Sequence, residues 1–233
     1  MTACSSKPAE TAAPETQAET TADTTAEAVE EAKTEAAEAV EGKDPAEVKV
    51  GISIYQFADN FMTVYRQELE RYLTEELGVK KENISIMDGK NDQGEQMNQI
   101  RNFITTGVDV MIINLVQASS EPTVTEECAK AGIPVVYINR EPEAEREQAW
   151  VDEGIKATYV GADARQSGTF QGEEIAELEN KGDADGDGVV RYIMVQGDPE
   201  NVDAQYRTEF SIKALTDAGI EVEELVKMRG DWD

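Results

Sequence analysis

The sequence predicts an α/β protein built from doubly wound parallel sheets. Short runs rich in β-branched residues alternate with amphipathic stretches from Val48 to the end of the 233-residue chain. The runs are almost continuously apolar, which is typical of strands buried on both faces of a parallel sheet. The stretches between them repeat apolar residues at helical spacing, as crossover helices do. A chain of this length leaves room for about two compact units.

The first unit is predicted over residues 48–158. Its four strands are expected in the segments VKVGISIY, NISIMD, VDVMIINL and IPVVYIN, in that order. A helix is predicted from about Asn60, because apolar residues recur after that point at i, i+4, i+7 and i+8. A second helix carries Met97 and Ile100, and a third surrounds Cys128, which we expect to be a buried free thiol. The charged stretch EPEAEREQAWVDEG is predicted to be a loop.

A second α/β unit is predicted over residues 159–233. It is expected to open with the strand ATYVGAD and to continue with a helix in ARQSGTFQGEEIAEL, where Gly168 and Gly172 lie four apart and would permit close packing against a sheet. The strand VVRYIMVQG, a helix through Phe210 and the strand EVEELVKM follow. About three strands are too few to bury both faces of such a sheet. We therefore expect a truncated second unit and a chain that is a fragment.

Residues 1–47 are predicted to form a disordered acidic tether. They contain 12 acidic and 3 basic residues and no Leu, Ile, Phe, Tyr or Trp. Such a segment cannot bury enough apolar surface to offset the entropy lost on ordering. Cys4 follows two small residues in TACSSK, which resembles the end of a bacterial lipoprotein signal. We expect an extracytoplasmic lipoprotein, at the cell surface or in the periplasm, held to the membrane only through a lipid on Cys4.

The overall composition excludes several functions. The chain has 21 basic and 49 acidic residues, a net charge of −28, so it would repel nucleic acid and anionic membranes. It contains no histidine, which removes Ser-His and Cys-His nucleophile pairs and the usual zinc ligand sets. No apolar run approaches the length that a membrane span needs. The two cysteines are too few for a disulfide framework.

The stretch DADGDG resembles part of a calcium loop. Asp183, Asp185 and Asp187 occupy the first, third and fifth positions, a glycine follows at the sixth, and Val189 offers a backbone carbonyl at the seventh. The ninth position is Arg191, and the twelfth is a methionine where an EF-hand has glutamate. An ordinary EF-hand is therefore excluded. From the spacing alone, a simple turn between a helix and a strand explains these residues equally well.

An ordered set of motifs from about Val48 to Asp233 resembles a known family. The motifs are IYQFADNFM, NDQGEQMNQI, IINLV, IPVVYINREP, YVGADARQSGTFQG, DADGDGVVRY, GDPENVDAQYR and a closing WD. They are similar to the galactose/glucose substrate-binding proteins of ABC importers, which have the type I periplasmic-binding-protein fold. The resemblance implies two Rossmann-like lobes joined by a hinge, with a hexose held between them. It implies a non-catalytic protein whose partners are an ABC permease and, in some cases, a chemoreceptor.

The resemblance assigns sugar-binding roles to residues at strand ends and helix starts, where open α/β sheets place their ligands. An alternative stands beside each role: Asp59 could simply cap a helix, Asn139 could form a turn, and Asp203 and Arg207 could form an exposed ion pair. Asn201 replaces a histidine of the family, so the sequence does not rank galactose above glucose. The expected sugar-binding residues are Asp59, Phe61, Asn139, Asn201, Asp203, Arg207 and Trp232.

The resemblance also implies a structural calcium ion at the DADGDG loop. Its ligands would be Asp183, Asp185, Asp187 and the Val189 carbonyl, together with a glutamate from further along the chain. Arg191 stands where the family has a glutamine ligand, so we expect weak or absent calcium binding by residues 1–233. An alternative function is a sugar-sensing ligand domain, for another hexose or a pentose, that acts through a receptor or regulator.

Overall fold

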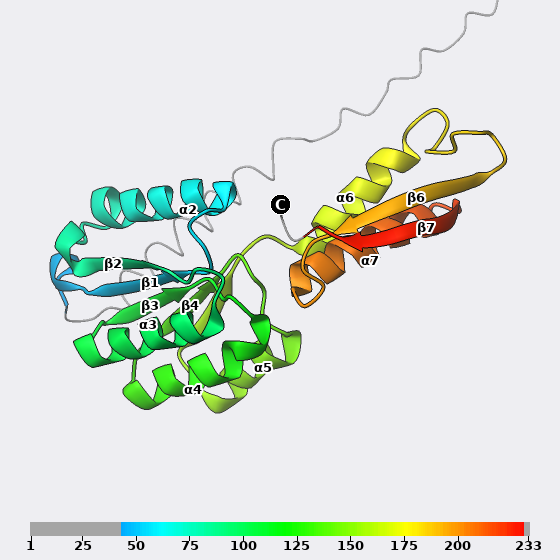
Figure 1. Cartoon of the computed structure of the whole chain (residues 1–233). Helices are drawn as coiled ribbons and strands as arrows, with labels where there is room; N and C mark the ends of the chain where they lie inside the picture. The colour runs from blue at the N-terminus through cyan, green and yellow to red at the C-terminus, as the bar shows by residue number, and fades with distance from the viewer. Residues whose placement is uncertain (1–42, 231–233) are drawn as a thin grey trace, which may run out of the picture. The chain divides into compact units, whose positions relative to one another are not determined.

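The computed structural model describes residues 43–230 (Figure 1). The chain divides into two units, Met1–Lys43 and Asp44–Asp233, and the fold below is that of the second unit. Cys4, Trp232 and most of the predicted tether lie outside the described residues. None of the helices within residues 43–230 has the length and apolar character that crossing a membrane requires.

Regular structure in the described residues begins before residue 48, where the tether was predicted to end. Asp44 caps a short 3-10 turn, η1 (Pro45–Glu47), by accepting a hydrogen bond from the Ala46 N–H at 2.9 Å. The Asn83 side chain donates to the Ala46 carbonyl at 2.9 Å. The second contact ties residues 44–47 to the turn just before β2 without any large apolar side chain, so composition did not reveal this segment.

The first sheet has five parallel strands in the order β2-β1-β3-β4-β5. This order is that of a doubly wound sheet, and the order reverses between β1 and β3, where such folds place their ligands. The five strands are β1 (Val50–Ile54), β2 (Ile84–Asp88), β3 (Val110–Ile113), β4 (Val135–Ile138) and β5 (Ala157–Val160).

Helices cover both faces of this sheet (Figure 1). Helix α2 lies on one face, and α3, α4 and α5 lie on the other. Each face has its own core: Met62 of α2 packs with Ile52 and Ile54 of β1, whereas Phe103 of α3 packs with Met111 of β3 on the opposite side. The helices are α2 (Asn60–Arg71, continued by a π turn over Tyr72–Glu76), α3 (Gln93–Thr106), α4 (Glu121–Ala131) and α5 (Ala144–Glu153). Short 3-10 turns occur at Lys81–Asn83 and Ala118–Ser120.

Two predictions for the segment after β4 are wrong. The charged stretch predicted as a loop contains helix α5, which is anchored by Trp150, 3% exposed and stacked on Tyr137 with ring centroids 5.4 Å apart. The strand expected to open the second unit near Tyr159 is β5, which pairs with β4 and completes the first sheet. Helix α5 is the crossover between these two strands. Trp150 is its single large buried side chain, so apolar residues do not recur along this segment at the spacing that would predict a helix.

The remaining described elements form a second sheet with its own helices. Strands β6 (Val189–Gln196) and β7 (Glu221–Arg229) are parallel neighbours, and helices α6 (Ala164–Ala176) and α7 (Val202–Asp217) precede them. The two glycines do permit close packing, but the prediction that α6 packs there against a sheet is wrong. Their partner is α7: the backbone of Gly168 lies against Arg207 and that of Gly172 against Ser211. This contact fixes the position of α7, which carries the predicted site residues Asp203 and Arg207 and is capped by a third, Asn201.

Replacing Gly172 with alanine is expected to lower the free energy of unfolding by about 1–3 kcal/mol. An added Cβ would overlap the carbonyl oxygen of Ser211 and lie 2.7 Å from the Cβ of Ala214, so α6 would have to move away from α7. Gly94→Ala, near the start of α3, is the matched control, because the nearest atom there is a carboxylate oxygen of Asp92 at 3.2 Å. Urea denaturation of both variants would test the prediction, and equal stabilities would contradict it.

Candidate ligand-binding site

A cavity of about 430 Å³ lies where the carboxyl ends of β1, β4 and β5 meet the start of α7. It is the size of a small-molecule site. Six of the seven residues predicted to bind sugar line it, and the seventh, Trp232, lies outside the described residues. The lining residues are Tyr55, Asp59, Phe61, Tyr65, Asn139, Arg140, Val160, Gly161, Ala162, Asn201, Asp203 and Arg207.

Asp59 is both a helix cap and a residue of the cavity wall. Its Oδ1 accepts a hydrogen bond from the Met62 N–H at 2.7 Å at the start of α2. The alternative prediction, that Asp59 caps this helix, is therefore confirmed. Its Oδ2 accepts from the Tyr55 hydroxyl at 2.5 Å. Each carboxylate oxygen has two lone pairs, so both remain able to accept from a ligand hydroxyl. The cap and the tyrosine fix the direction in which this carboxylate points.

Tyr55 and Arg140 form a layer behind Asp59 that the sequence analysis missed. The Arg140 guanidinium lies 4.0 Å from the Tyr55 ring centroid and donates to the carbonyls of Leu115 and Val116 at 3.2 and 2.5 Å. Arg140 is only 7% exposed, and burial lowers its pKa. Burial and the bond to Asp59 raise the pKa of Tyr55 to about 12, so its hydroxyl stays protonated and donates to the carboxylate.

Asn139 ends β4 with a left-handed backbone conformation, φ 64°. Asparagine tolerates this conformation better than most residues, so the predicted turn is present. The Asn114 side chain donates to Asn139 Oδ1 at 3.2 Å. The Asn139 Nδ2 group makes no hydrogen bond to another residue of the described range 43–230. The residue therefore presents its NH₂ group to the cavity as a free donor, and its oxygen keeps one lone pair.

Helix α7 begins at the cavity with Asn201 and Asp203. Asn201 caps the helix: its Oδ1 accepts from the N–H groups of Asp203 and Ala204 at 2.9 and 3.3 Å. Its amide NH₂ remains as a donor. Asp203 is buried, and its Oδ2 accepts from the Glu141 N–H, just after β4, at 3.0 Å. Burial raises the pKa of Asp203, whereas the Glu141 N–H and the nearby Arg207 act in the opposite direction.

Arg207 lies one turn after Asp203 on α7 and also lines the cavity. The alternative prediction, an exposed Asp203–Arg207 ion pair, is wrong: Asp203 is buried, and no ion pair within 4.0 Å joins the two in the described structure. The Arg207 side chain donates no hydrogen bond to another residue among the described ones. Its five N–H donors are therefore available to a ligand.

Aromatic rings supply the apolar part of the cavity. Phe61 is 61% exposed although it lies beside the cavity, and its ring contacts Tyr65 with centroids 5.8 Å apart. A phenyl ring exposed to this degree gains stability when a ligand covers it. Val160 ends β5 and forms another part of the cavity wall together with the two small residues that follow it, Gly161 and Ala162.

The arrangement suits binding of an uncharged, hydroxyl-rich molecule. The cavity wall holds two carboxylates and two guanidinium groups, so its charges balance although the whole chain carries −28. The two amides supply further donors, and aromatic rings lie beside them. None of the lining residues is a serine, cysteine, histidine or lysine, so the two aspartates and two tyrosines are the lining groups that could take or give a proton.

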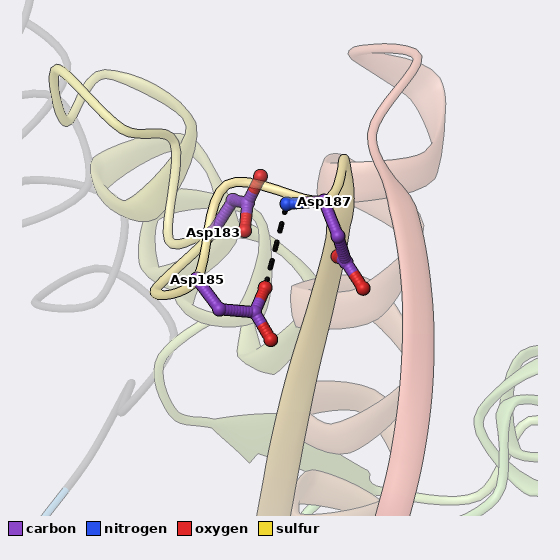
Figure 2. Close-up of side chains that lie close together, drawn as sticks. All are labelled: Asp183, Asp185 and Asp187. Atoms are coloured by element: carbon purple, nitrogen blue, oxygen red, sulfur yellow. Dashed lines mark hydrogen bonds between the residues drawn. The ribbon is translucent and has the colours of Figure 1, made fainter.

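The three aspartates of the DADGDG loop lie together at the start of β6 (Figure 2). One oxygen of each lies within 4.8 Å of the others. Both oxygens of Asp183 accept loop N–H groups, from Gly186 and Gly188, at 2.8 Å each, and this lowers its pKa. Asp187 N–H donates to Asp185 Oδ1 at 3.4 Å. Asp187 Oδ1 accepts from the N–H of Val189, which opens β6, at 3.0 Å.

The residues present do not fit calcium without rearrangement. The Arg191 guanidinium donates to Asp187 Oδ2 at 2.6 Å and to Asp185 Oδ2 at 3.3 Å, so it occupies oxygens that the predicted ion would need. This contact is the main reason that the pKa of Asp187 is lowered to about 2. Calcium binding by Asp183, Asp185, Asp187 and Val189 stays an untested prediction.

Comparison with known proteins identifies the family. The sequence profile described as "Periplasmic binding protein domain" matches residues 50–233, most of the chain. The chain belongs to the periplasmic binding protein family. Its parallel sheets with flanking helices match the type I fold of that family, which confirms the predicted fold class.

One curated relative in this family is the D-galactose/methyl-galactoside binding periplasmic protein MglB of Haemophilus influenzae. It is 32% identical over 191 residues, which cover 81% of this chain and 56% of the relative. The chain spans about half the length of the curated relatives that it matches first.

Solved structures of the family superpose well on this chain. An ABC transporter solute binding protein from Bacillus halodurans with bound myo-inositol is 27% identical, with a TM-score of 0.64 over 82% of this chain and 60% of that one. The fructose binding periplasmic domain of a hybrid two component system is 21% identical, with a TM-score of 0.65 over 80% of this chain and 55% of that one. The second likeness concerns the fold alone.

Proposed function

We propose that the protein binds a small neutral sugar or related polyol in this cavity and delivers it to an ABC importer outside the cytoplasm. The observation that carries the proposal is the set of groups left free at the cavity wall. Asn139, Asn201 and Arg207 present donors, and Asp59 and Asp203 present acceptors. A sugar hydroxyl both donates and accepts, so it matches a wall of this mixed kind.

The balance of charge favours a neutral ligand over an acid or an amine. An anionic ligand would meet two buried or half-buried carboxylates, and a cationic ligand would meet two guanidinium groups. Each would leave an uncompensated charge in a site of low dielectric, which is costly. The exposed Phe61 ring suits the C–H face of a hexose or a cyclitol.

Galactose and glucose are the first candidate ligands. The relative from Haemophilus influenzae, named for galactose and methyl-galactoside binding, supports this choice. The myo-inositol held by the Bacillus halodurans protein makes cyclitols the next candidates. The Asn201 oxygen caps α7, so this residue would offer the ligand only its NH₂ group. The orientation of the sugar hydroxyl that faces this group would then decide between sugars.

A sensing role is the second candidate function. The fructose binding domain of a two component system shares this fold, so a sugar site of this shape can also serve a receptor. A sugar-dependent signal that persists without any permease would favour sensing, whereas sugar uptake that needs both this protein and a permease would favour import. We expect no enzyme activity, and incubation with aryl galactosides should release no aglycone.

Membrane attachment through Cys4 also stays a proposal. The short stretch TACSSK supports it, and the residue lies outside the described structure. Mass spectrometry of the protein expressed with its full upstream sequence would test it. A lipid on Cys4 is expected, and an unmodified cysteine would contradict the proposal.

A thermal-shift screen of the full-length protein tests the ligand class. Galactose, glucose, myo-inositol, ribose and arabinose would each be added, with galacturonate as a charged control. A ligand that binds only the folded state at 100 times its dissociation constant stabilises it by about 2.7 kcal/mol. Stabilisation by a neutral sugar or cyclitol is expected. Stabilisation by galacturonate alone would contradict the charge argument, and no response to any of them would contradict the proposed function.

A further inference from the structure

The DADGDG loop of this chain is contacted by a positively charged side chain, that of Arg191. Residues 183–189 turn sharply between α6 and β6, with Gly186 at φ 79° and Gly188 at φ 94°. The two N–H groups that Asp183 accepts come from these same glycines. The bend is thus held at Asp183 by backbone hydrogen bonds. The negative charges of Asp185 and Asp187 still need a cationic partner.

Arg191 neutralises those charges from β6. Its Nη2 lies 2.6 Å from Asp187 Oδ2 and its Nη1 lies 3.3 Å from Asp185 Oδ2. Its Nε lies 3.0 Å from Glu223 Oε2 on β7. The planar guanidinium therefore contacts three carboxylates at once, which its fork of donors allows and a lysine ammonium on a flexible stem does less well.

The sheet fixes this position. Arg191 is the direct register partner of Glu223 in the parallel ladder of β6 and β7. It also follows Asp187 by four residues, which brings its side chain back over the loop. The guanidinium reaches the aspartates from a paired strand, so its place does not depend on the loop alone.

We infer that the Arg191 guanidinium takes the place of a divalent cation in this loop, so that the loop closes without calcium and excludes it. A calcium ion bound by Asp185 and Asp187 would have to displace the guanidinium or lie a few ångströms from it. Either course opposes binding, because like charges at that distance repel and a displaced guanidinium loses its two aspartate partners. The inference concerns this loop and does not depend on the identity of the sugar.

Calcium titration of the full-length protein tests the inference, with thermal unfolding and calorimetry as readouts. The wild type is expected to unfold at the same temperature in EGTA and in millimolar calcium. Arg191→Gln removes the charge and supplies an amide oxygen, and it is expected to bind calcium at least about tenfold more tightly than the wild type, with a calcium-dependent rise in Tm. Arg191→Lys keeps the charge and should remain insensitive to calcium.

Two controls make the outcome specific. Lys227→Gln on β7 makes the same change of charge further along the sheet and should gain no calcium response. Asp187→Asn in the Arg191→Gln background should abolish the gain. Calcium binding by the wild type equal to that of Arg191→Gln would overturn the inference, and so would an Arg191→Gln protein that folds but gains no binding. If Arg191→Gln folds poorly in EGTA, its rescue by calcium but not by magnesium supports the inference, and a failure of calcium to rescue it overturns it.

Discussion

Replacing Arg207 with alanine is expected to weaken sugar binding about 100-fold. Its guanidinium lines the cavity and makes no hydrogen bond to another residue among those described, so a ligand would be its main partner. Two hydrogen bonds from a charged donor, at about 1.5 kcal/mol each, account for about 3 kcal/mol, which corresponds to roughly a factor of 100 in the dissociation constant. Isothermal titration calorimetry with the sugar found in the thermal-shift screen measures this change.

The fold should tolerate this substitution. Arg207 reaches the cavity from α7, and the packing of α7 on α6 at this point uses the Arg207 backbone, which alanine retains. Lys213→Ala is the matched control on the same helix: it removes the same charge from an exposed ion pair with Asp217 and should change sugar affinity less than twofold. Wild-type affinity in Arg207→Ala would contradict the placement of Arg207 at the ligand.

The sequence predicted the parts of the fold that repeat strongly along the chain. The buried strands β1, β3 and β4 are nearly continuous apolar runs, and α3 has a clear apolar face with Ile100 and Phe103. Helix α2 also has its predicted start, because Asp59 at the N-cap is a local signal. In these elements the local preference and the tertiary environment agree, so reading the chain alone is enough.

The parts that sequence did not predict depend on contacts across the fold. Arg140 looks like a surface residue in the sequence, but the carbonyls of Leu115 and Val116, about 25 residues away, hold it in the interior. Tyr55 appeared only as the end of a strand, and its bond to Asp59 needs the exact turn between β1 and α2. A polar residue directly after a buried strand is the one signal that could have identified both.

The candidate site was predictable in its residue positions but not in their hydrogen bonds. Asp59, Asn139 and Asn201 each occupy the end of a strand or the start of a helix, where the sequence pattern is readable. Their hydrogen-bond partners were not readable: the cap formed by Asn201 consumes its oxygen, and the Glu141 N–H occupies one oxygen of Asp203. Their positions came from the sequence pattern and their sugar-binding roles from the resemblance to the family, whereas the choice between donor and acceptor required coordinates.

Replacing Glu121 with alanine is expected to lower the free energy of unfolding by about 3–5 kcal/mol. This carboxylate is fully buried at the start of α4. Its Oε1 accepts from the Thr125 hydroxyl at 2.5 Å and from the Trp150 indole N–H at 2.8 Å, and its Oε2 pairs with Arg146 at 2.7 Å. Alanine would leave the buried Trp150 N–H without its acceptor, leave the Thr125 hydroxyl with Tyr137 alone, and leave one guanidinium without its partner.

The same helix supplies the control. Glu126→Ala breaks an exposed pair with Lys130 and should change stability by about 0.5 kcal/mol or less. Urea denaturation of both variants measures the difference, and Glu121→Gln, which keeps the shape and one acceptor, should fall between them. A loss below about 1 kcal/mol in Glu121→Ala would contradict the network.

The Glu121 network has a consequence for the binding cavity. Through Thr125 and Trp150 it joins α4 and α5, and Thr125 also bonds the hydroxyl of Tyr137 in β4 at 2.7 Å. Asn139 directly follows strand β4, so the helices that this carboxylate joins also set the strand that leads into a cavity residue. Glu121→Ala should therefore weaken sugar binding as well, although Glu121 does not line the cavity. A variant that loses stability but keeps full affinity in its folded fraction would show that β4 holds its position without the two helices.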